Sequence, residues 1–116
     1  MEIIIKTKDL KLTPGLETFV NQKVGRLKKL LLENSLRKIE IELGLVTLRQ
    51  QKGDIYSAKI MISEPRGKLL RAYAEEETIK TAIVKAREDI QAQLTKFKER
   101  LETERKKEIK IKQEEI

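Results

Sequence analysis

Hydrophobic and polar residues follow one another along this chain with two different periods. In residues 78–101, apolar side chains recur every three or four positions, which is the spacing of one face of an α-helix. A second stripe of this period follows Thr13 and Pro14, a favourable helix start because threonine caps and proline suits the first helical position. We expect this first helix to end near Asn34 and Ser35. The stripe of the last helix consists of Ile79, Ile83, Ala86, Ile90, Leu94, Phe97 and Leu101.

The remaining segments have the two-residue period of half-buried strands. Residues 36–46, 55–63 and 68–74 alternate in this way, and a β-branched run opens the chain at residues 2–6. The order β-α-β-β-β-α predicts an α+β fold: a two-layer sandwich with two helices packed on one face of a four-stranded sheet. The first two strands should pair in parallel, and the others should form an antiparallel meander.

We expect one domain over residues 1–101 and a charged tail over residues 102–116. The chain of 116 residues is long enough for one modest core. The tail, ETERKKEIKIKQEEI, suits either a helical extension or disorder, and we favour fraying beyond about Lys107. The N-terminus does not resemble a signal peptide, and no apolar run approaches the roughly 18 residues of a membrane span. We therefore expect a cytoplasmic protein without a membrane partner.

The composition excludes several kinds of chemistry. The chain contains no histidine and no cysteine, so it forms no disulfide, no Cys/His zinc site and no histidine acid–base centre. Carboxylates such as Glu40 and Glu42 alternate on a wet strand face, where they are not desolvated for catalysis. The glycines are isolated and make no phosphate-binding loop. We expect a binding protein and not an enzyme, with no cofactor, no metal and no small-molecule substrate.

Positive charge is concentrated on the two predicted helices. The formal net charge is +7; residues 14–32 carry four cations against one acid, and residues 78–101 carry six against three. This distribution is typical of helices that face phosphate, although a lysine-rich solubilising surface has the same composition. In the last helix the cations flank the apolar stripe, with Lys85, Lys96 and Arg100 on one side and Lys80, Arg87 and Lys98 on the other.

Lys23 is the most informative single cation. It falls within the apolar arc of the first helix, where an ammonium group buried without a partner would be costly. It can extend its charge out along the helix–helix groove, which is a purely structural role, or line that groove with Arg26 to meet a phosphate; the two interpretations are compatible, because an extended lysine still presents its charge there. The candidate RNA-binding residues are Lys23, Arg26, Lys28, Lys29, Lys85, Arg87, Lys96, Lys98 and Arg100.

Several segments together carry a family resemblance. The last helix contains Ala82-Ile83, then Gln93-Leu94-Thr95-Lys96-Phe97-Lys98 and Leu101; the first contains Leu16, Phe19-Val20, Lys23, Arg26 and Leu27; the last strands contain Tyr56, Pro65, Gly67 and Ala72-Tyr73-Ala74. In this order and spacing, they resemble the short ribosome hibernation-promoting factors, or ribosome-associated inhibitors, formerly called sigma-factor modulation proteins. The resemblance covers residues 3–101.

This resemblance implies a fold similar to a double-stranded-RNA-binding domain and a place in the decoding channel of the small ribosomal subunit. It implies that basic residues of both helices contact 16S-type ribosomal RNA, and that messenger RNA and transfer RNA are blocked under slow growth or stress. The chain has no second domain like that of the long-form members, so we expect a monomer that does not pair ribosomes. Asp89 and Ala92 stand where the family commonly has basic residues, and Lys80 where it usually has tyrosine, which leaves the RNA footprint open.

Two other interpretations remain at this point. A protein-interaction module would use the tail or the open sheet face, and a general double-stranded-RNA binder would use charge alone. Reversing the charges of Lys23 and Arg26 should abolish ribosome binding and leave a protein-binding sheet face unaffected. We expect Tyr56 in the core. The residues of the open sheet face are Lys38, Glu40, Glu42, Arg71 and Tyr73.

Overall fold

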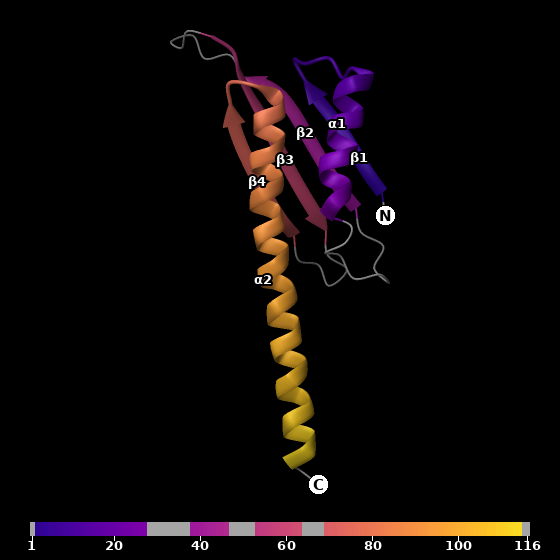
Figure 1. Ribbon diagram of the computed structural model, residues 1–116, viewed down its shortest axis with the longest axis vertical. Coiled ribbons are helices and arrows are strands. Elements are labelled where there is room, and N and C mark those ends of the chain that lie inside the picture. The colour runs from indigo at the N-terminus through magenta and orange to yellow at the C-terminus, as the bar shows by residue number, and fades with distance from the viewer. Residues whose placement is uncertain (1, 28–37, 47–52, 64–68, 115–116) are drawn as a thin grey trace.

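The computed structural model describes residues 2–27, 38–46, 53–63 and 69–114. Within these ranges, Glu2, Lys98 and residues 101–114 are described by their backbone alone. Its elements follow the predicted β-α-β-β-β-α order, and the α+β prediction is confirmed (Figure 1). They are β1 (Glu2–Lys8), α1 (Pro14–Gly25), β2 (Lys38–Val46), β3 (Ile55–Ser63), β4 (Leu69–Glu76) and α2 (Ile79–Glu114).

The four strands form one sheet in the order β1-β2-β3-β4. As expected, β1 pairs with β2 in parallel, and β2–β3 and β3–β4 are antiparallel. The register aligns Ile41, Ile60 and Ala72 in one row across three strands, so alternate residues share a face. Both helices cover this face and run side by side in the same direction along it (Figure 1).

The core lies between the sheet and the two helices and is almost entirely aliphatic. Val20 and Val24 of α1 and Ile83 and Ile90 of α2 are fully buried against the strands. Removing an aliphatic side chain of this kind from water stabilises the fold by about 1.5–3 kcal/mol. Tyr56 is only half-buried and is not part of the buried cluster, so the expectation of a core tyrosine is wrong.

Both predicted helix caps are present. The Thr13 hydroxyl accepts a hydrogen bond from the Leu16 N–H at 3.2 Å, and the Thr78 hydroxyl accepts one from the Thr81 N–H at 3.2 Å. The α-helix α1 ends at Gly25, and residues 26 and 27 have 3₁₀ geometry. Glycine is a poor helix former, which favours a stop at this point. The expected end at residues 34–35 lies outside the described residues.

The second correction concerns the length of α2, which continues through residues 102–114 and past the expected fraying point at Lys107. Straight-chain charged residues are good helix formers, and Glu102 and Glu108 precede Lys106 and Lys112 by the favourable four positions. Among the residues of α2 whose side chains the structure describes, Leu94 is the last one buried in the core. The rest of the helix projects beyond the sheet and gives the molecule extents of 67 × 29 × 20 Å (Figure 1).

Candidate nucleic-acid interface

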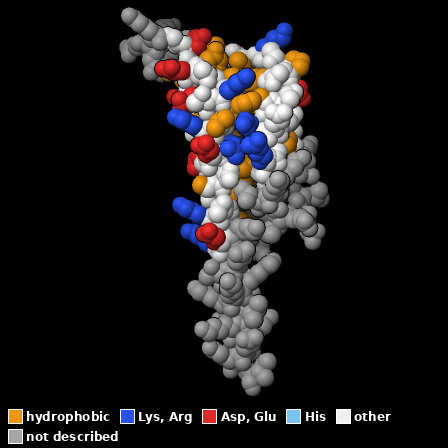
Figure 2. Space-filling model, in the orientation of Figure 1, with side chains coloured by type: hydrophobic (Ala, Val, Ile, Leu, Met, Phe, Trp, Pro, Cys, Tyr) orange, Lys and Arg blue, Asp and Glu red, His pale blue; other side chains and the backbone are white. Residues whose placement is uncertain are grey.

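Cations gather where the two helices lie side by side. Figure 2 shows blue side chains over the boundary between α1 and α2, among apolar ones. In α1, positions 19, 23 and 26 follow the i, i+4, i+7 spacing of one helical face; in α2, positions 80 and 87 share a face in the same way. We call this region the inter-helix surface and define it by Phe19, Lys23, Arg26, Lys80 and Arg87.

The centre of the inter-helix surface is the ring of Phe19. The Nζ atom of Lys23 lies over this ring at 5.6 Å from its centroid, and the Nζ atom of Lys80 lies at 5.4 Å from the same centroid. Each contact is a cation–π interaction, which stabilises by about 0.5–1 kcal/mol at an exposed site. Lys23 is half-buried, and its ammonium group reaches the boundary between the helices as the sequence suggested.

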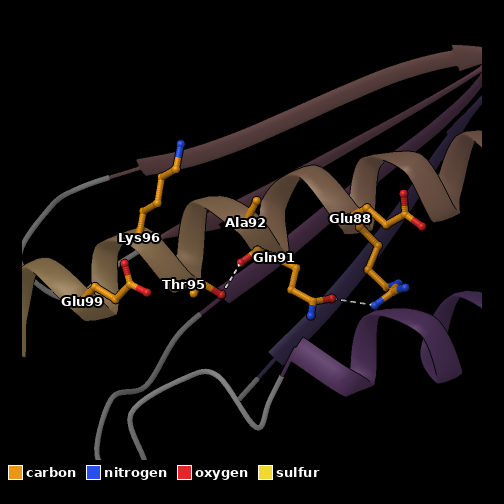
Figure 3. Close-up of a pocket in the computed structure, with 7 residues that line it drawn as sticks. Glu88, Gln91, Ala92, Thr95, Lys96 and Glu99 are labelled. Atoms are coloured by element: carbon orange, nitrogen blue, oxygen red, sulfur yellow. Dashed lines mark hydrogen bonds between the residues drawn. The ribbon is translucent and has the colours of Figure 1, made fainter.

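Arg87 follows the buried residue Ala86 on α2, at the edge of the core-facing side, and is half-buried. Its Nη1 group donates a hydrogen bond to Oε1 of Gln91 at 2.8 Å, and Figure 3 shows Gln91 pointing from α2 toward α1. The Nε–H group of Arg87 is buried and has no hydrogen-bond partner among the described residues. An unsatisfied buried donor of this kind costs about 1–3 kcal/mol.

The other flank of α2 has a different electrostatic character. The Nζ atom of Lys85 lies 2.5 Å from Oε1 of Glu76 at the end of β4, and this carboxylate raises the pKa of Lys85 through a hydrogen bond and its charge. Asp89 lies on the same flank and accepts a hydrogen bond from Gln93 at 3.3 Å. Lys96 also projects to this side of α2, away from Gln91 (Figure 3). Anionic groups therefore offset much of the positive charge on this flank.

The nine candidate residues do not form one cluster. Lys23, Arg26 and Arg87 belong to the inter-helix surface, whereas Lys85, Lys96 and Arg100 lie on the other flank of α2 by their helical positions. Lys28 and Lys29 lie outside the described residues, as does the side chain of Lys98. The candidate set omitted Lys80 and Phe19, although the four-residue spacing of Phe19 and Lys23 was a signal in the sequence.

The open face of the sheet is polar and internally paired. The Nζ atom of Lys38 lies 3.0 Å from Oε1 of Glu40, and this hydrogen bond and charge lower the pKa of Glu40. The Tyr73 hydroxyl donates to Glu75 at 2.5 Å, which raises the pKa of the tyrosine. Two large apolar side chains are exposed on this face: Tyr73 at 55% and Leu69 at 41%.

Two other kinds of site were sought in the parts of the chain that the structure describes. No group of three or more acidic side chains there is arranged to hold a metal ion. Neither described helix is both long and apolar enough to cross a membrane.

Comparison with known proteins decides the family. Residues 3–102 match the family model described as Sigma 54 modulation protein / S30EA ribosomal protein. The chain belongs to this family. The match covers the β-α-β-β-β-α domain and confirms the family predicted from the sequence. We call it the S30EA family below.

Two solved structures share the fold of this S30EA-family protein. The N-terminal domain of Protein Y from Thermus thermophilus has a TM-score of 0.65 and 22% identity, over 83% of this chain and 94% of that one. A ribosomal subunit interface protein from Coxiella burnetii has a TM-score of 0.69 and 17% identity, over 84% of this chain and 98% of that one. No curated protein matches this chain in sequence.

Proposed function

We propose that this S30EA-family protein is a ribosome-associated translation inhibitor, or hibernation factor. It acts in the cytoplasm and binds the small ribosomal subunit in the decoding channel, where it blocks messenger RNA and transfer RNA. Basic residues of both helices contact 16S-type ribosomal RNA, and the action needs neither catalysis nor a cofactor. The family match over residues 3–102 supports a ribosomal target.

The observation that carries the proposal is the unneutralised charge of the inter-helix surface. Lys23, Arg26, Lys80 and Arg87 form no ion pair with any carboxylate that the structure describes. Four such cations on two rigid helices suit the phosphates of a folded RNA, because helical RNA is recognised mainly by shape and backbone contacts. Peripheral contacts would come from Lys85, Lys96 and Arg100 on the other flank, from Lys98 on the same side of α2 as Lys80 and Arg87, and from Lys28 and Lys29 beyond α1.

Co-sedimentation with purified small ribosomal subunits tests this function. We expect stoichiometric pelleting at low salt that is lost at high salt, since phosphate contacts release counterions. Prebound messenger RNA and transfer RNA should block it if the decoding channel is the site. Absence of pelleting at low salt would refute the proposal. Pelleting that prebound transfer RNA leaves unchanged would place the protein elsewhere on the subunit.

A second candidate function is a protein-interaction module that uses the open sheet face. The exposure of Tyr73 and Leu69 favours it, because aromatic and large apolar side chains are common at the centres of protein interfaces. In that case, substitutions on the sheet face would abolish activity and substitutions on the helices would not.

A further inference from the structure

The strand β4 forms one edge of the sheet, because it stands last in the strand order. Alternate residues of an edge strand direct their backbone N–H and C=O groups away from the neighbouring strand. Arg71 is one of them, since its carbonyl oxygen accepts a hydrogen bond at 2.7 Å from Nε2 of Gln93 on the outer flank of α2. Leu69, Tyr73 and Glu75 share this direction, because each lies two or four residues from Arg71 along the strand. We call the outward backbone groups of these four residues the β4 edge.

The side chains along the β4 edge are complementary to those of a second copy of the chain. Arg71 and Glu75 lie two residues on either side of Tyr73, and all three are exposed on the open sheet face. If two β4 strands pair antiparallel with Tyr73 opposite Tyr73, each Arg71 faces Glu75 of the other copy. Opposite charges at facing positions stabilise such a pair, and like charges destabilise it. Arg71 forms no ion pair with any carboxylate that the structure describes, so its charge is available for this contact.

The side of the sheet that the helices cover leaves room for the second copy. On that side, β4 carries Ala72 and Ala74, whose side chains are short. Helix α2 packs on both β4 and β3, so its axis lies inward from the edge (Figure 1). With strands about 4.8 Å apart, the two α2 helices would be separated by roughly 10 Å across the pair, which is a normal distance between packed helices.

Gln93 closes the β4 edge in this structure. Its Nε2 group donates to the Arg71 carbonyl oxygen and also to Oδ1 of Asp89 at 3.3 Å, which holds the amide against the strand. An added strand needs the same oxygen, because the N–H group of Glu75 in the second copy would bond to it in this register. The amide of Gln93 therefore competes with a second β4 strand.

We propose that the β4 edge is an interaction surface for a second copy of this chain and that Gln93 keeps it closed. Each copy supplies β4 in antiparallel register, with Tyr73 at the two-fold axis and two ion pairs between Arg71 and Glu75. The dimer forms when both Gln93 side chains turn away from the strand, and the chain is otherwise a monomer. The proposal is independent of ribosome binding, because the cations assigned to RNA lie on the helices.

Sedimentation equilibrium of the full chain measures the dissociation constant of this dimer. Gln93→Ala removes the amide and keeps a strong helix former, so we expect its Kd to be at least about tenfold below that of the wild type. The control is Gln91→Ala, which removes the same amide from the side of α2 that faces α1 and should leave the Kd unchanged (Figure 3). An equal gain in Gln91→Ala would overturn the proposal. A Gln93→Ala variant that associates no better than the wild type, or stays monomeric at millimolar concentration, would refute a second copy as the occupant.

A charge exchange tests the register of the two strands. In the Gln93→Ala background, Arg71→Glu places acids opposite one another across the pair, and we expect the Kd of the dimer to rise at least about tenfold. Adding Glu75→Arg to that variant exchanges the two charges and should restore the Kd to within about threefold. A dimer that Arg71→Glu leaves unchanged, or that the exchange does not restore, would show that the copies meet through another surface and would overturn the proposal.

Discussion

Lys85 and Glu76 form an ion pair that joins the beginning of α2 to the end of β4, with 2.5 Å between Nζ and Oε1. The Glu76 carboxylate therefore pairs with Lys85, which is one of the RNA-binding residues predicted from the sequence. The two flanks of α2 are therefore unequal: the flank at β4 has an internal anion, whereas the cations of the inter-helix surface have no described carboxylate partner.

Substitution Glu76→Gln should make RNA binding tighter. It frees Lys85 from its partner and removes one negative charge near the RNA, so we expect about a two- to fivefold gain in affinity for small subunits at low salt. Glu75→Gln removes the same charge from the open sheet face and is the matched control. An equal gain in both variants would show that only net charge matters.

Reversal of two charges on α1 should abolish ribosome binding. Lys23→Glu with Arg26→Glu places two anions on the inter-helix surface, and we expect a loss of about 100-fold or more in affinity in a sedimentation assay. Lys6→Glu with Lys59→Glu changes the net charge by the same amount on β1 and β3. This control should lose less than about tenfold. A larger loss of affinity in the Lys6→Glu, Lys59→Glu variant would show that the sheet face binds the ribosome.

The pKa of Tyr73 should lie above its ordinary value of 10.0, because its hydroxyl donates to the Glu75 carboxylate. The chain has no tryptophan and two tyrosines, so absorbance of tyrosinate in a Tyr56→Phe variant reports on Tyr73 alone. As pH rises above 10.0, deprotonation should be delayed relative to a free tyrosine, and Glu75→Gln should remove the delay. A midpoint that Glu75→Gln leaves unchanged would contradict the hydrogen bond.

Two glycines should respond oppositely to alanine. An added Cβ at Gly25 meets nothing within 4 Å, so Gly25→Ala should stabilise the protein by about 0.4–1 kcal/mol. At Gly44 a Cβ would lie 3.0 Å from the Ser57 hydroxyl and 3.5 Å from the Lys8 carbonyl oxygen, and Gly44→Ala should cost about 1–3 kcal/mol. Urea unfolding of both variants checks the signs, and destabilisation by Gly25→Ala would contradict the open surroundings at that position.

Removal of residues 102–116 should leave the domain folded. Among the described side chains of α2, the last buried one is Leu94, and Phe97 is half-buried, so we expect a change below about 1 kcal/mol in the free energy of unfolding. Urea unfolding of the chain ending at Leu101 measures it. A loss of cooperative unfolding would show that the overhanging part of α2 belongs to the domain.

The sheet and its buried face were predictable because burial imposes a period on the sequence. Ile39, Ile41 and Leu43 alternate with charged residues, and a register shift of one residue would turn all three to solvent. The length of α2 depended on small differences in helix propensity. At residues 102–114 those propensities outweighed the low hydrophobicity that suggested fraying.

The candidate site could be predicted only in part from the sequence, because some of its contacts join distant segments. The spacing of Phe19 and Lys23 is local, and so their proximity on one helix face follows from the sequence. The approach of Lys80 to Phe19 joins two helices that are distant in the sequence, and it depends on their parallel packing over the sheet. The pairing of Lys85 with Glu76 likewise requires the turn between β4 and α2.

The projecting part of α2 affects how the molecular mass of this protein should be measured in solution. The radius of gyration is 17.8 Å, whereas a compact chain of this length would have about 13 Å. A rod-like molecule of 13.5 kDa diffuses more slowly than a sphere of the same mass and leaves a gel-filtration column early. A monomer would then pass for a dimer, so its stoichiometry off and on the ribosome is best taken from sedimentation equilibrium, where shape does not enter.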